Sequence, residues 1–433
     1  MRKLAIIADD LSSATDCGIQ MAKSGLRTYV PLSWSGIGSA ASVADVVSID
    51  TDSRTMAASE AYGQVKRATD LVLAAGFSSI YKSLDSTLRG NLGAEVDAVL
   101  DVFDVDFAAV APAYPLYGRT TLGGKHSLAG QPINTTEFAT DPQCPVQDDD
   151  LMRLFAAQSR RKVGLVPIAV LHEGNYAVRR LLASLISEKV ALAVFDAEVE
   201  ADLDRIASAV AASGYSVLWV GSTGLARCVP RALDMRVKHG RRLGRRPLFG
   251  RTLLVVGSAS EITHQQLCNL HRQRDVVAVE IDPLKLIADS RIARSETHRC
   301  ESLLVDALRG GTDAILRVPS SRKAVGTAQA LGSQKGLSRL EVSGKIVAAL
   351  AHIARLVLNA CRLRGVIVTG GDTAKAVCGQ LGATGIHIWD EVEPGIALGQ
   401  LAGDHEILMV TKAGAFGTPH SLIRAVEALE MQG

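Results

Sequence analysis

Aromatic residues, closely spaced cysteines and long apolar segments are scarce in this 433-residue sequence. Phe, Trp and Tyr together make up 4% of it. No apolar run approaches the roughly 20 residues of a membrane-spanning helix, so we expect no membrane partner. The seven cysteines are scattered and form no CxxC pair, which favours a reducing compartment and a cytoplasmic location. The short apolar stretch near the N-terminus meets Asp9 and Asp10 at once, which argues against a signal peptide.

Several sequence signatures of known activities are also missing. No HExxH pattern or other histidine pair at metal-ligand spacing occurs, so we expect no protein-built metal site. A GxSxG turn is absent, which disfavours a serine hydrolase, and so are a Walker A loop and a GxGxxG fingerprint. The net charge of +2 argues against a nucleic-acid partner bound through global charge. With 47% hydrophobic and 21% charged residues, the composition is that of an ordinary α/β protein.

Short apolar runs bounded by polar residues recur along the chain and predict buried strands. In the first half these runs are residues 3–8, 45–50, 78–84, 107–113, 163–171, 190–197 and 215–222. Amphipathic helix patterns lie between them, as in residues 91–103, whose apolar face consists of Leu92, Val96, Val99, Leu100 and Phe103. This alternation predicts an α/β fold with a mainly parallel sheet covered on both sides.

The length and one break in composition predict two such α/β domains. Residues 236–251 crowd Arg and Lys around glycines, and we interpret them as a basic linker between domains at 1–235 and 252–433. Nucleic-acid binding by this segment is an alternative, although no aromatic platform accompanies the charge. Residues 318–343 are rich in Ser, Gly and Lys, which predicts a mobile loop with one short helix.

Charged and hydroxyl side chains gather where the predicted strands of the first domain end. The groups in chain order are Asp9 and Asp10; Asp52 and Arg54; Lys82, Asp85, Ser86 and Arg89; and Tyr114, Arg119, Thr120 and Thr121. In open α/β sheets, ligands bind at the carboxyl ends of the strands. Cations and carboxylates together suit a small polyhydroxylated anion, with Arg54 and Lys82 as candidates to hold its carboxylate.

The same side chains have ordinary structural explanations. Asp10, Ser12 and Asp85 have the residue type of a helix cap, Asp85 for a helix that starts near Ser86. The remaining charges are also compatible with surface ion pairs. Four strand ends of the same character favour a shared site over separate caps. His126 lies near these segments, and we interpret it as a loop residue rather than a base.

The second domain carries glycine turns after its predicted strands. "TGGDTAKAV" places Gly370 and Gly371 before a helix that starts near Asp372 or Thr373, and backbone N–H groups at such a place bind phosphate. "VVGSAS" at 255–260 and "KAGAFG" at 412–417 have the same character. Each turn alone is more often a plain tight turn. Together they predict a nucleotide site, with Lys412 either neutralising phosphate or facing solvent at a strand end.

Several of these blocks resemble those of the four-carbon acid sugar kinase family, whose members phosphorylate threonate, erythronate or 3-oxo-tetronate with ATP. In chain order they are "IADDLSSATDCG", "DTDSR", "YKSLDSTLRGN", "APAYPLYGRTTLGG", "TEFATDPQCPV", "GSAS", "VTGGDTAKAV", "EVEPGIALG" and "TKAGAFG". The resemblance covers nearly the whole chain. Ser12 and Ser13 stand where the family usually has Thr-Gly, which would tighten this loop or reshape the substrate pocket. Asp372 stands where many members carry Glu.

The resemblance implies that the first domain binds the sugar acid, the second binds ATP, and the reaction takes place in the cleft between them. Matching motifs assign the substrate to Asp10, Arg54, Lys82, Ser83 and Asp85, and the strand-end pattern adds Asp9 and Arg89. Matching motifs assign ATP to Ser258, Gly370, Gly371, Asp372, Thr373 and either Gly414 or Gly417, and the glycine pattern adds Lys412.

Phosphoryl transfer from ATP, with Mg²⁺ neutralising phosphate charge, also needs a group that takes the proton of the attacking hydroxyl. We assign this role first to Asp85, with Asp10 as the alternative, and expect Lys82 and Arg89 to stabilise the transferred charge or hold the substrate carboxylate. D-Threonate, converted to D-threonate 4-phosphate, is the preferred substrate. Erythronate and 3-oxo-tetronate stay open because they differ at one carbon. A non-catalytic sensor is a further alternative, against which the retained Asp10, Asp85 and Lys82 argue. The sequence also leaves a homodimer open.

Overall fold

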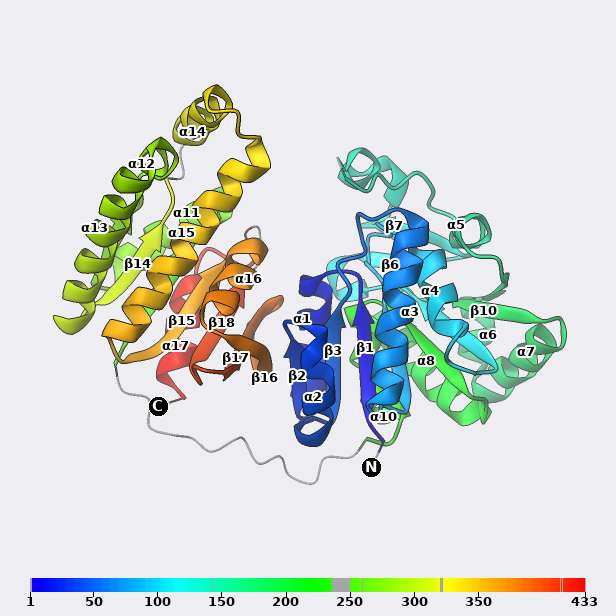
Figure 1. Ribbon diagram of the computed structural model, residues 1–433. Coiled ribbons are helices and arrows are strands. Elements are labelled where there is room, and N and C mark those ends of the chain that lie inside the picture. The colour runs from blue at the N-terminus through cyan, green and yellow to red at the C-terminus, as the bar shows by residue number, and fades with distance from the viewer. Residues whose placement is uncertain are drawn as a thin grey trace. The chain divides into compact units, whose positions relative to one another are not determined.

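The computed structural model describes residues 2–141, 143–235, 250–258, 260–319, 322–412, 414 and 416–432. Residues up to 235 and residues from 250 onward fall into two compact units. The basic linker expected at 236–251 lies outside the described residues except for Gly250 and Arg251. Both units are α/β and mainly parallel, as the sequence predicts (Figure 1).

The first unit is built on a parallel sheet with the strand order β2-β3-β1-β4-β11-β5-β10-β9. Its strands are β1 (Leu4–Ala8), β2 (Thr28–Pro31), β3 (Val46–Asp50), β4 (Ser79–Ser83), β5 (Phe107–Ala111), β9 (Lys162–Val166), β10 (Val190–Phe195) and β11 (Val217–Gly221). Strands β1 and β5 are buried along their whole length, which is why they read as continuous apolar runs.

Helices cover both faces of this sheet. One layer, in which neighbours contact one another, contains α2 (Ile37–Val43), α3 (Ala58–Ala74), α4 (Leu92–Leu100) and α5 (Leu151–Gln158). The other contains α1 (Leu11–Lys23), α6 (Ile168–Glu173), α7 (Asn175–Ser187), α8 (Glu200–Ser213), α9 (Thr223–Ala226) and α10 (Val229–Ala232). Residues 168–171, which were expected to continue a strand, instead form the start of α6, because Pro167 stands at the helix start.

A small antiparallel sheet lies beside this core and was not expected from the sequence. It has the order β6-β7-β8, formed by β6 (Arg119–Leu122), β7 (Lys125–Leu128) and β8 (Gln131–Pro132). Gly123 and Gly124 connect β6 to β7 with positive φ angles of 60° and 74°, which glycine adopts without strain. The carboxylate of Asp196 accepts hydrogen bonds from both of their N–H groups, at 2.9 Å each, and so fixes the turn.

The second unit has the strand order β13-β14-β12-β15-β18-β17-β16. The strands are β12 (Arg251–Val256), β13 (Val276–Glu280), β14 (Asp313–Arg317), β15 (Leu363–Thr369), β16 (Ala383–Glu393), β17 (Ile396–Gly403) and β18 (Leu408–Lys412). The first four and β18 pair in parallel. Strands β16 and β17 form an antiparallel hairpin against β18 that the strand predictions did not include.

Helices again flank the sheet of the second unit. They are α11 (Glu261–Gln273), α12 (Pro283–Ala288), α13 (Ser290–Arg309), α14 (Arg322–Gln334), α15 (Arg339–Ala360), α16 (Gly371–Gln380) and α17 (Ser421–Glu430). The expectation of a mobile loop with one short helix at 318–343 is wrong, because α14 and the start of α15 occupy this segment. Val342 and Ala328 are buried against Ile287, so the few apolar residues of the segment form a small core of their own.

Candidate functional site

Three loops converge at the carboxyl edge of the first sheet. Strand β1 lies between β3 and β4, with Ile7 opposite both Ile49 and Lys82, so the residues after these strands become neighbours. The backbone oxygen of Asp9 accepts hydrogen bonds from the N–H groups of Ser53 and Arg54, at 3.0 and 3.3 Å. The first and second polar clusters of the sequence therefore form one assembly.

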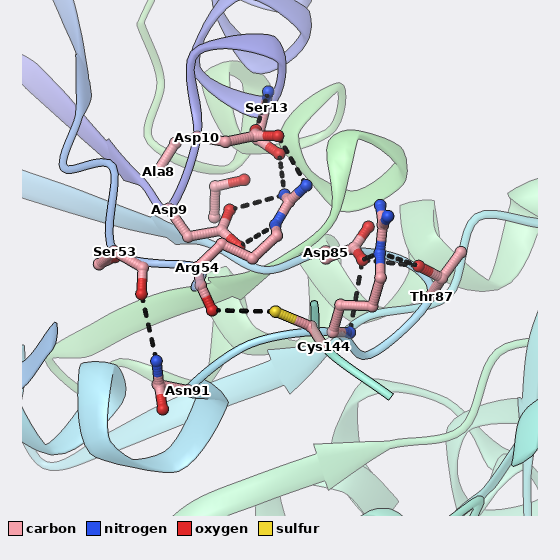
Figure 2. A network of polar contacts seen from close by, with 12 residues as sticks. Ala8, Asp9, Asp10, Ser13, Ser53, Arg54, Asp85, Thr87, Asn91 and Cys144 are labelled. Carbon is pink, nitrogen blue, oxygen red and sulfur yellow. Dashed lines mark hydrogen bonds and ion pairs between the residues drawn. The ribbon is translucent and has the colours of Figure 1, made fainter. Parts of the chain in front are cut away.

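Arg54 lies between two carboxylates in this assembly (Figure 2). Its Nε and Nη2 atoms contact the two carboxylate oxygens of Asp9 at 2.7 and 3.0 Å. Its Nη1 lies 2.6 Å from Oδ2 of Asp10, and Nη2 also donates to Ser13 Oγ at 3.0 Å. Such bidentate contacts are among the stronger polar interactions in proteins. The guanidinium expected to hold a substrate carboxylate thus has internal carboxylate partners.

Asp85 forms a second cluster with the loop that follows β4. Its Oδ2 accepts hydrogen bonds from Nε of Arg89 and from the hydroxyl of Thr87, both at 2.6 Å. Arg89 also reaches Asp141, with Nη1 at 3.4 Å from Oδ2. Asp85 caps no helix at Ser86, because residues 84–91 contain no helix and α4 begins only at Leu92. That structural alternative for Asp85 is wrong.

The two candidate bases differ in their proton affinity. Burial is the largest influence on Asp10 and raises its pKa above the usual range, although Arg54 opposes the shift. Burial also raises the pKa of Asp85, but Arg54 and Arg89 outweigh it and hold that pKa at about 2. The side chain of Asp10 is 28% exposed and that of Asp85 is 10% exposed. Asp10 also caps α1, since its Oδ1 accepts from the N–H of Ser13 at 2.7 Å.

Lys82 and Ser83 point into the protein at the end of β4. The ammonium of Lys82 is fully buried, lies 2.7 Å from Oε2 of Glu95 and donates to the backbone oxygen of Ser83 at 2.6 Å. The hydroxyl of Ser83 lies 3.4 Å from the thiol of Cys17. Burial is the largest influence on the pKa of Glu95 and raises it, while Lys82 opposes the shift. Lys82 therefore holds the end of β4 in place through buried contacts.

Three residues that the sequence analysis did not assign to the site take part in it. Glu95 accepts a hydrogen bond from Ser53 at 2.7 Å and so joins Lys82 to the loop that carries Arg54. Gly90 has φ +94°, and a Cβ there would lie 3.3 Å from Cγ of Arg54. Ser13, the residue that replaces the usual glycine, accepts a hydrogen bond from Nη2 of Arg54 with its hydroxyl oxygen. The sequence offered one indication of the role of Glu95, namely a charged residue next to the apolar face of α4.

His126 lies on β7, not in a loop as expected. Its Nε2 lies 2.9 Å from the backbone oxygen of Ser86, and Nδ1 lies 2.9 Å from the hydroxyl of Thr121. Burial is the largest influence on its pKa and lowers it to about 4, so the ring is neutral near pH 7. These contacts connect the small sheet to the loop that carries Asp85.

The glycine turns of the second unit also meet at one sheet edge. Strand β15 lies between β12 and β18, so their ends are adjacent. A Cβ on Gly257 would collide with the hydroxyl of Thr373, and one on Gly414 would collide with the hydroxyl of Ser258. A Cβ on Gly370 would lie 3.4 Å from the same Thr373 hydroxyl. Residues Ser258, Gly370, Thr373 and Gly414 are therefore in close proximity.

The start of α16 is suited to an anion. Gly370 precedes it with φ +99° and supplies no side-chain cap, so the first N–H groups of the helix lack that partner. Gly371 and Asp372 are exposed. Gly417 stands apart, since with φ +88° a Cβ there would collide with Ser421 at the start of α17.

Lys412 is buried, so the alternative of a solvent-facing lysine is wrong. Its ammonium donates to the backbone oxygens of Gly414 and Phe416 at 3.0 and 3.1 Å. Two hydroxyls fix the same loop, because Ser260, within the predicted "VVGSAS" turn, and Thr263, which the sequence did not indicate, donate to the backbone oxygen of Gly414 at 2.7 and 2.8 Å. Burial lowers the pKa of Lys412 to about 8, against the opposing charge of Glu393.

Within the part of the chain that the structure describes, no group of three or more His, Cys, Asp or Glu side chains has the arrangement of a metal site. No helix there combines the length and apolar character needed to cross a bilayer.

Comparison with protein families divides the chain in a similar way. The model of a sugar-binding N-terminal domain matches residues 4–229, which include the Asp9, Arg54 and Asp85 clusters. The model of a nucleotide-binding C-terminal domain matches residues 253–422, which include the glycine turns.

Curated relatives match the chain over nearly its whole length. A D-threonate kinase of Salmonella typhimurium is 34% identical over 99% of this chain and 98% of that protein. A D-erythronate kinase of Heliobacterium modesticaldum is 33% identical over 99% and 97%. A 3-oxo-tetronate kinase of Pseudomonas savastanoi pv. phaseolicola is 30% identical over 98% and 97%. Among solved structures, a Salmonella typhimurium LT2 protein superposes with a TM-score of 0.82 at 25% identity, covering 98% of this chain and 99% of its own.

Proposed function

Because this chain belongs to the four-carbon acid sugar kinase family, we propose that it transfers the γ-phosphoryl group of ATP to a hydroxyl of a four-carbon sugar acid. One observation carries the proposal. In the domain that matches sugar-binding proteins, the charge of Arg54 lowers the pKa of both Asp10 and Asp85, yet the pKa of Asp10 is raised overall and that of Asp85 is lowered. Groups whose environments push their pKa values apart are typical of acid–base sites. D-Threonate is the proposed substrate and D-threonate 4-phosphate the product, since a D-threonate kinase matches at 34% identity.

Asp10 is the proposed proton acceptor, in place of the first choice from sequence. Its raised pKa lies closer to neutral pH, and its side chain is the more exposed of the two. Asp85, which is ionised at any pH near neutral, orients Arg89. Arg54 holds Asp9 and Asp10 in place, and Lys82 with Ser83 supports β4 from within.

The proposed nucleotide site consists of Ser258, Gly370, Gly371, Asp372, Thr373 and Gly414, with Gly417 and Lys412 shaping the last loop. The N–H groups at the start of α16 bind phosphate oxygens. The exposed carboxylate of Asp372 would hold the Mg²⁺ that accompanies ATP, and the ion would neutralise phosphate charge there.

An ADP-release assay with MgATP tests the function directly. The panel contains both enantiomers of threonate and erythronate, together with enzymatically generated 3-oxo-tetronates. We expect turnover of D-threonate far above the other acids. Fast turnover of another acid would correct the substrate, and ATP binding without any turnover would favour the sensor.

Three expectations stay predictions. All seven cysteines are free thiols, which supports a reducing compartment such as the cytoplasm. Light scattering on the purified protein would decide between monomer and homodimer. A reaction between the two domains would be seen in a structure with both substrates.

A further inference from the structure

Among the residues that the structure describes, Arg119 differs from the other cations near the candidate site because no anion pairs with it. Arg54 pairs with Asp9 and Asp10, Arg89 pairs with Asp85 and Asp141, and Lys82 pairs with Glu95. Within the described residues, no hydrogen bond or ion pair is made by the Arg119 guanidinium, and its buried Nε has no acceptor. A buried polar group without a partner is rare and requires an explanation.

Three other arginines whose buried Nε makes no hydrogen bond do not share this property, and the Nε of one of them, Arg161, still lies 3.3 Å from Oδ1 of Asp97. Arg161 and Arg317 each pair with a carboxylate through Nη2, at 2.6 and 2.9 Å. Arg355 has Nη2 at 3.3 Å from Nδ1 of His352. Of these four side chains, Arg119 alone keeps its whole guanidinium without a hydrogen-bond acceptor in the described part of the chain.

The surroundings of Arg119 hold it in one place without neutralising it. Its backbone N–H and C=O pair with Tyr114 at 3.1 and 2.7 Å, which anchors the start of β6. The guanidinium lies over the ring of Tyr117, 5.6 Å from the centroid, and that ring packs edge-on against Tyr114 at 4.7 Å. A cation over an aromatic face keeps its N–H groups available at its edge.

Arg119 also belongs to the neighbourhood of the proposed site. Strand β6 pairs with β7 so that Thr121 faces His126, and His126 contacts the backbone of Ser86, next to Asp85. The charges of Asp85 and Arg89 act on the guanidinium of Arg119. Burial is the largest influence on its pKa and lowers it, with Asp85 opposing. Because burial disfavours the charged guanidinium, an anion that binds to it would stabilise it strongly.

We infer that Arg119 binds the carboxylate of the sugar acid, an inference that rests on the proposed function. A guanidinium fork matches a carboxylate through two parallel hydrogen bonds. This contact would distinguish a sugar acid from an uncharged polyol with the same hydroxyls. It also leaves Arg54 with Asp9 and Asp10, so the carboxylate site expected at Arg54 and Lys82 moves to β6.

The test compares D-threonate with D-threonamide, which keeps the hydroxyls and loses the charge. Wild-type protein should prefer the acid in kcat/KM. Arg119→Met should lower kcat/KM for the acid by about 100-fold and for the amide by less than about 3-fold, since a charge-assisted pair is removed only from the acid. Arg119→Lys keeps the charge without the fork, so an intermediate loss of about 10-fold for the acid is expected.

Arg153→Met is the matched control. Arg153 lies on α5 of the same unit, is exposed and pairs with Asp148, so both substrates should react as with wild type. Thermal melting of each variant verifies folding. Equal losses for acid and amide in Arg119→Met and Arg119→Lys would assign Arg119 a structural role and overturn the inference.

Calorimetric binding without ATP separates this inference from the proposed function. If wild type binds D-threonate but transfers no phosphate, the kinase proposal fails, and weaker binding of the acid alone by Arg119→Met still supports the carboxylate contact. Equal affinity of wild type for acid and amide would overturn the contact even if turnover is fast. If wild type neither binds nor phosphorylates any four-carbon acid, both proposals are wrong.

Discussion

The ammonium of Lys82 lies 2.7 Å from a carboxylate oxygen of Glu95, and both side chains are buried. This pair joins β4 to α4, and the second carboxylate oxygen of Glu95 extends the link to Ser53 and so to the loop of Arg54. The positive charge of Lys82 is therefore paired with a carboxylate inside the protein. Its effect on activity is expected to pass through the positions of the neighbouring strand ends.

A double-mutant cycle tests the role of this pair. Glu95→Leu removes the carboxylate partner of the buried ammonium, which keeps only the backbone oxygen of Ser83 among the described residues, and should lower the free energy of unfolding by about 3–5 kcal/mol. Lys82→Met combined with Glu95→Leu replaces both charges by apolar groups and should recover most of that loss. Urea unfolding of the single and double variants measures the coupling. Additive losses would mean that the two side chains act independently.

The choice between Asp10 and Asp85 as proton acceptor has a signature in pH. An acceptor must be ionised, so kcat/KM should fall as the pH decreases through the raised pKa of Asp10. Asp85, with a pKa of about 2, stays ionised over the same range and contributes no such limb. Asp10→Asn should lower kcat by about 100-fold or more and remove the limb.

Asp85→Asn is the comparison variant and should keep that acidic limb. Its activity should fall because Arg89 loses a charged partner at 2.6 Å. In the folded protein the depressed pKa of Asp85 also stabilises the fold above pH 3.8, and this contribution is lost as the pH falls through about 2. If the limb disappears in Asp85→Asn and persists in Asp10→Asn, the assignment from sequence was right.

The sequence predicted the strand ends well because a buried strand of a parallel sheet is a continuous apolar run, which ends where charged residues begin. Asp9, Arg54 and Asp85 accordingly lie where they were expected. Partners were harder to foresee, since pairing depends on distances across the fold. The order of residues does not reveal that Glu95 pairs with Lys82, or that the Arg119 guanidinium has no acceptor among the described residues.

The errors in secondary structure have a similar origin. The segment 318–343 reads as a loop because its serines and glycines weaken the helical pattern, yet α14 and α15 form through burial of a few residues such as Val342. The β16–β17 hairpin was missed because irregular register shifts interrupt its alternation. Tertiary packing decides both cases.

Lys412 should make ATP use sensitive to alkaline pH. Burial lowers its pKa to about 8, so its charge is lost as the pH rises through that value. If this charge attracts phosphate, kcat/KM for ATP should fall by about 10-fold per pH unit well above pH 8. Lys412→Met should show a low kcat/KM that no longer changes there. A pH profile identical in both proteins would restrict Lys412 to holding the backbone of Gly414 and Phe416.

Gly414 offers a steric test of the proposed nucleotide site. A Cβ at this position would collide with Ser258, so Gly414→Ala should displace the loop and weaken ATP binding by about 10-fold or more. Adding Ser258→Gly removes the colliding side chain and should restore part of the affinity. Gly379→Ala on α16 is the matched control, because a Cβ there meets nothing within 4 Å. Calorimetry with a non-hydrolysable ATP analogue measures all three variants. Wild-type affinity in Gly414→Ala would place the nucleotide away from these strand ends.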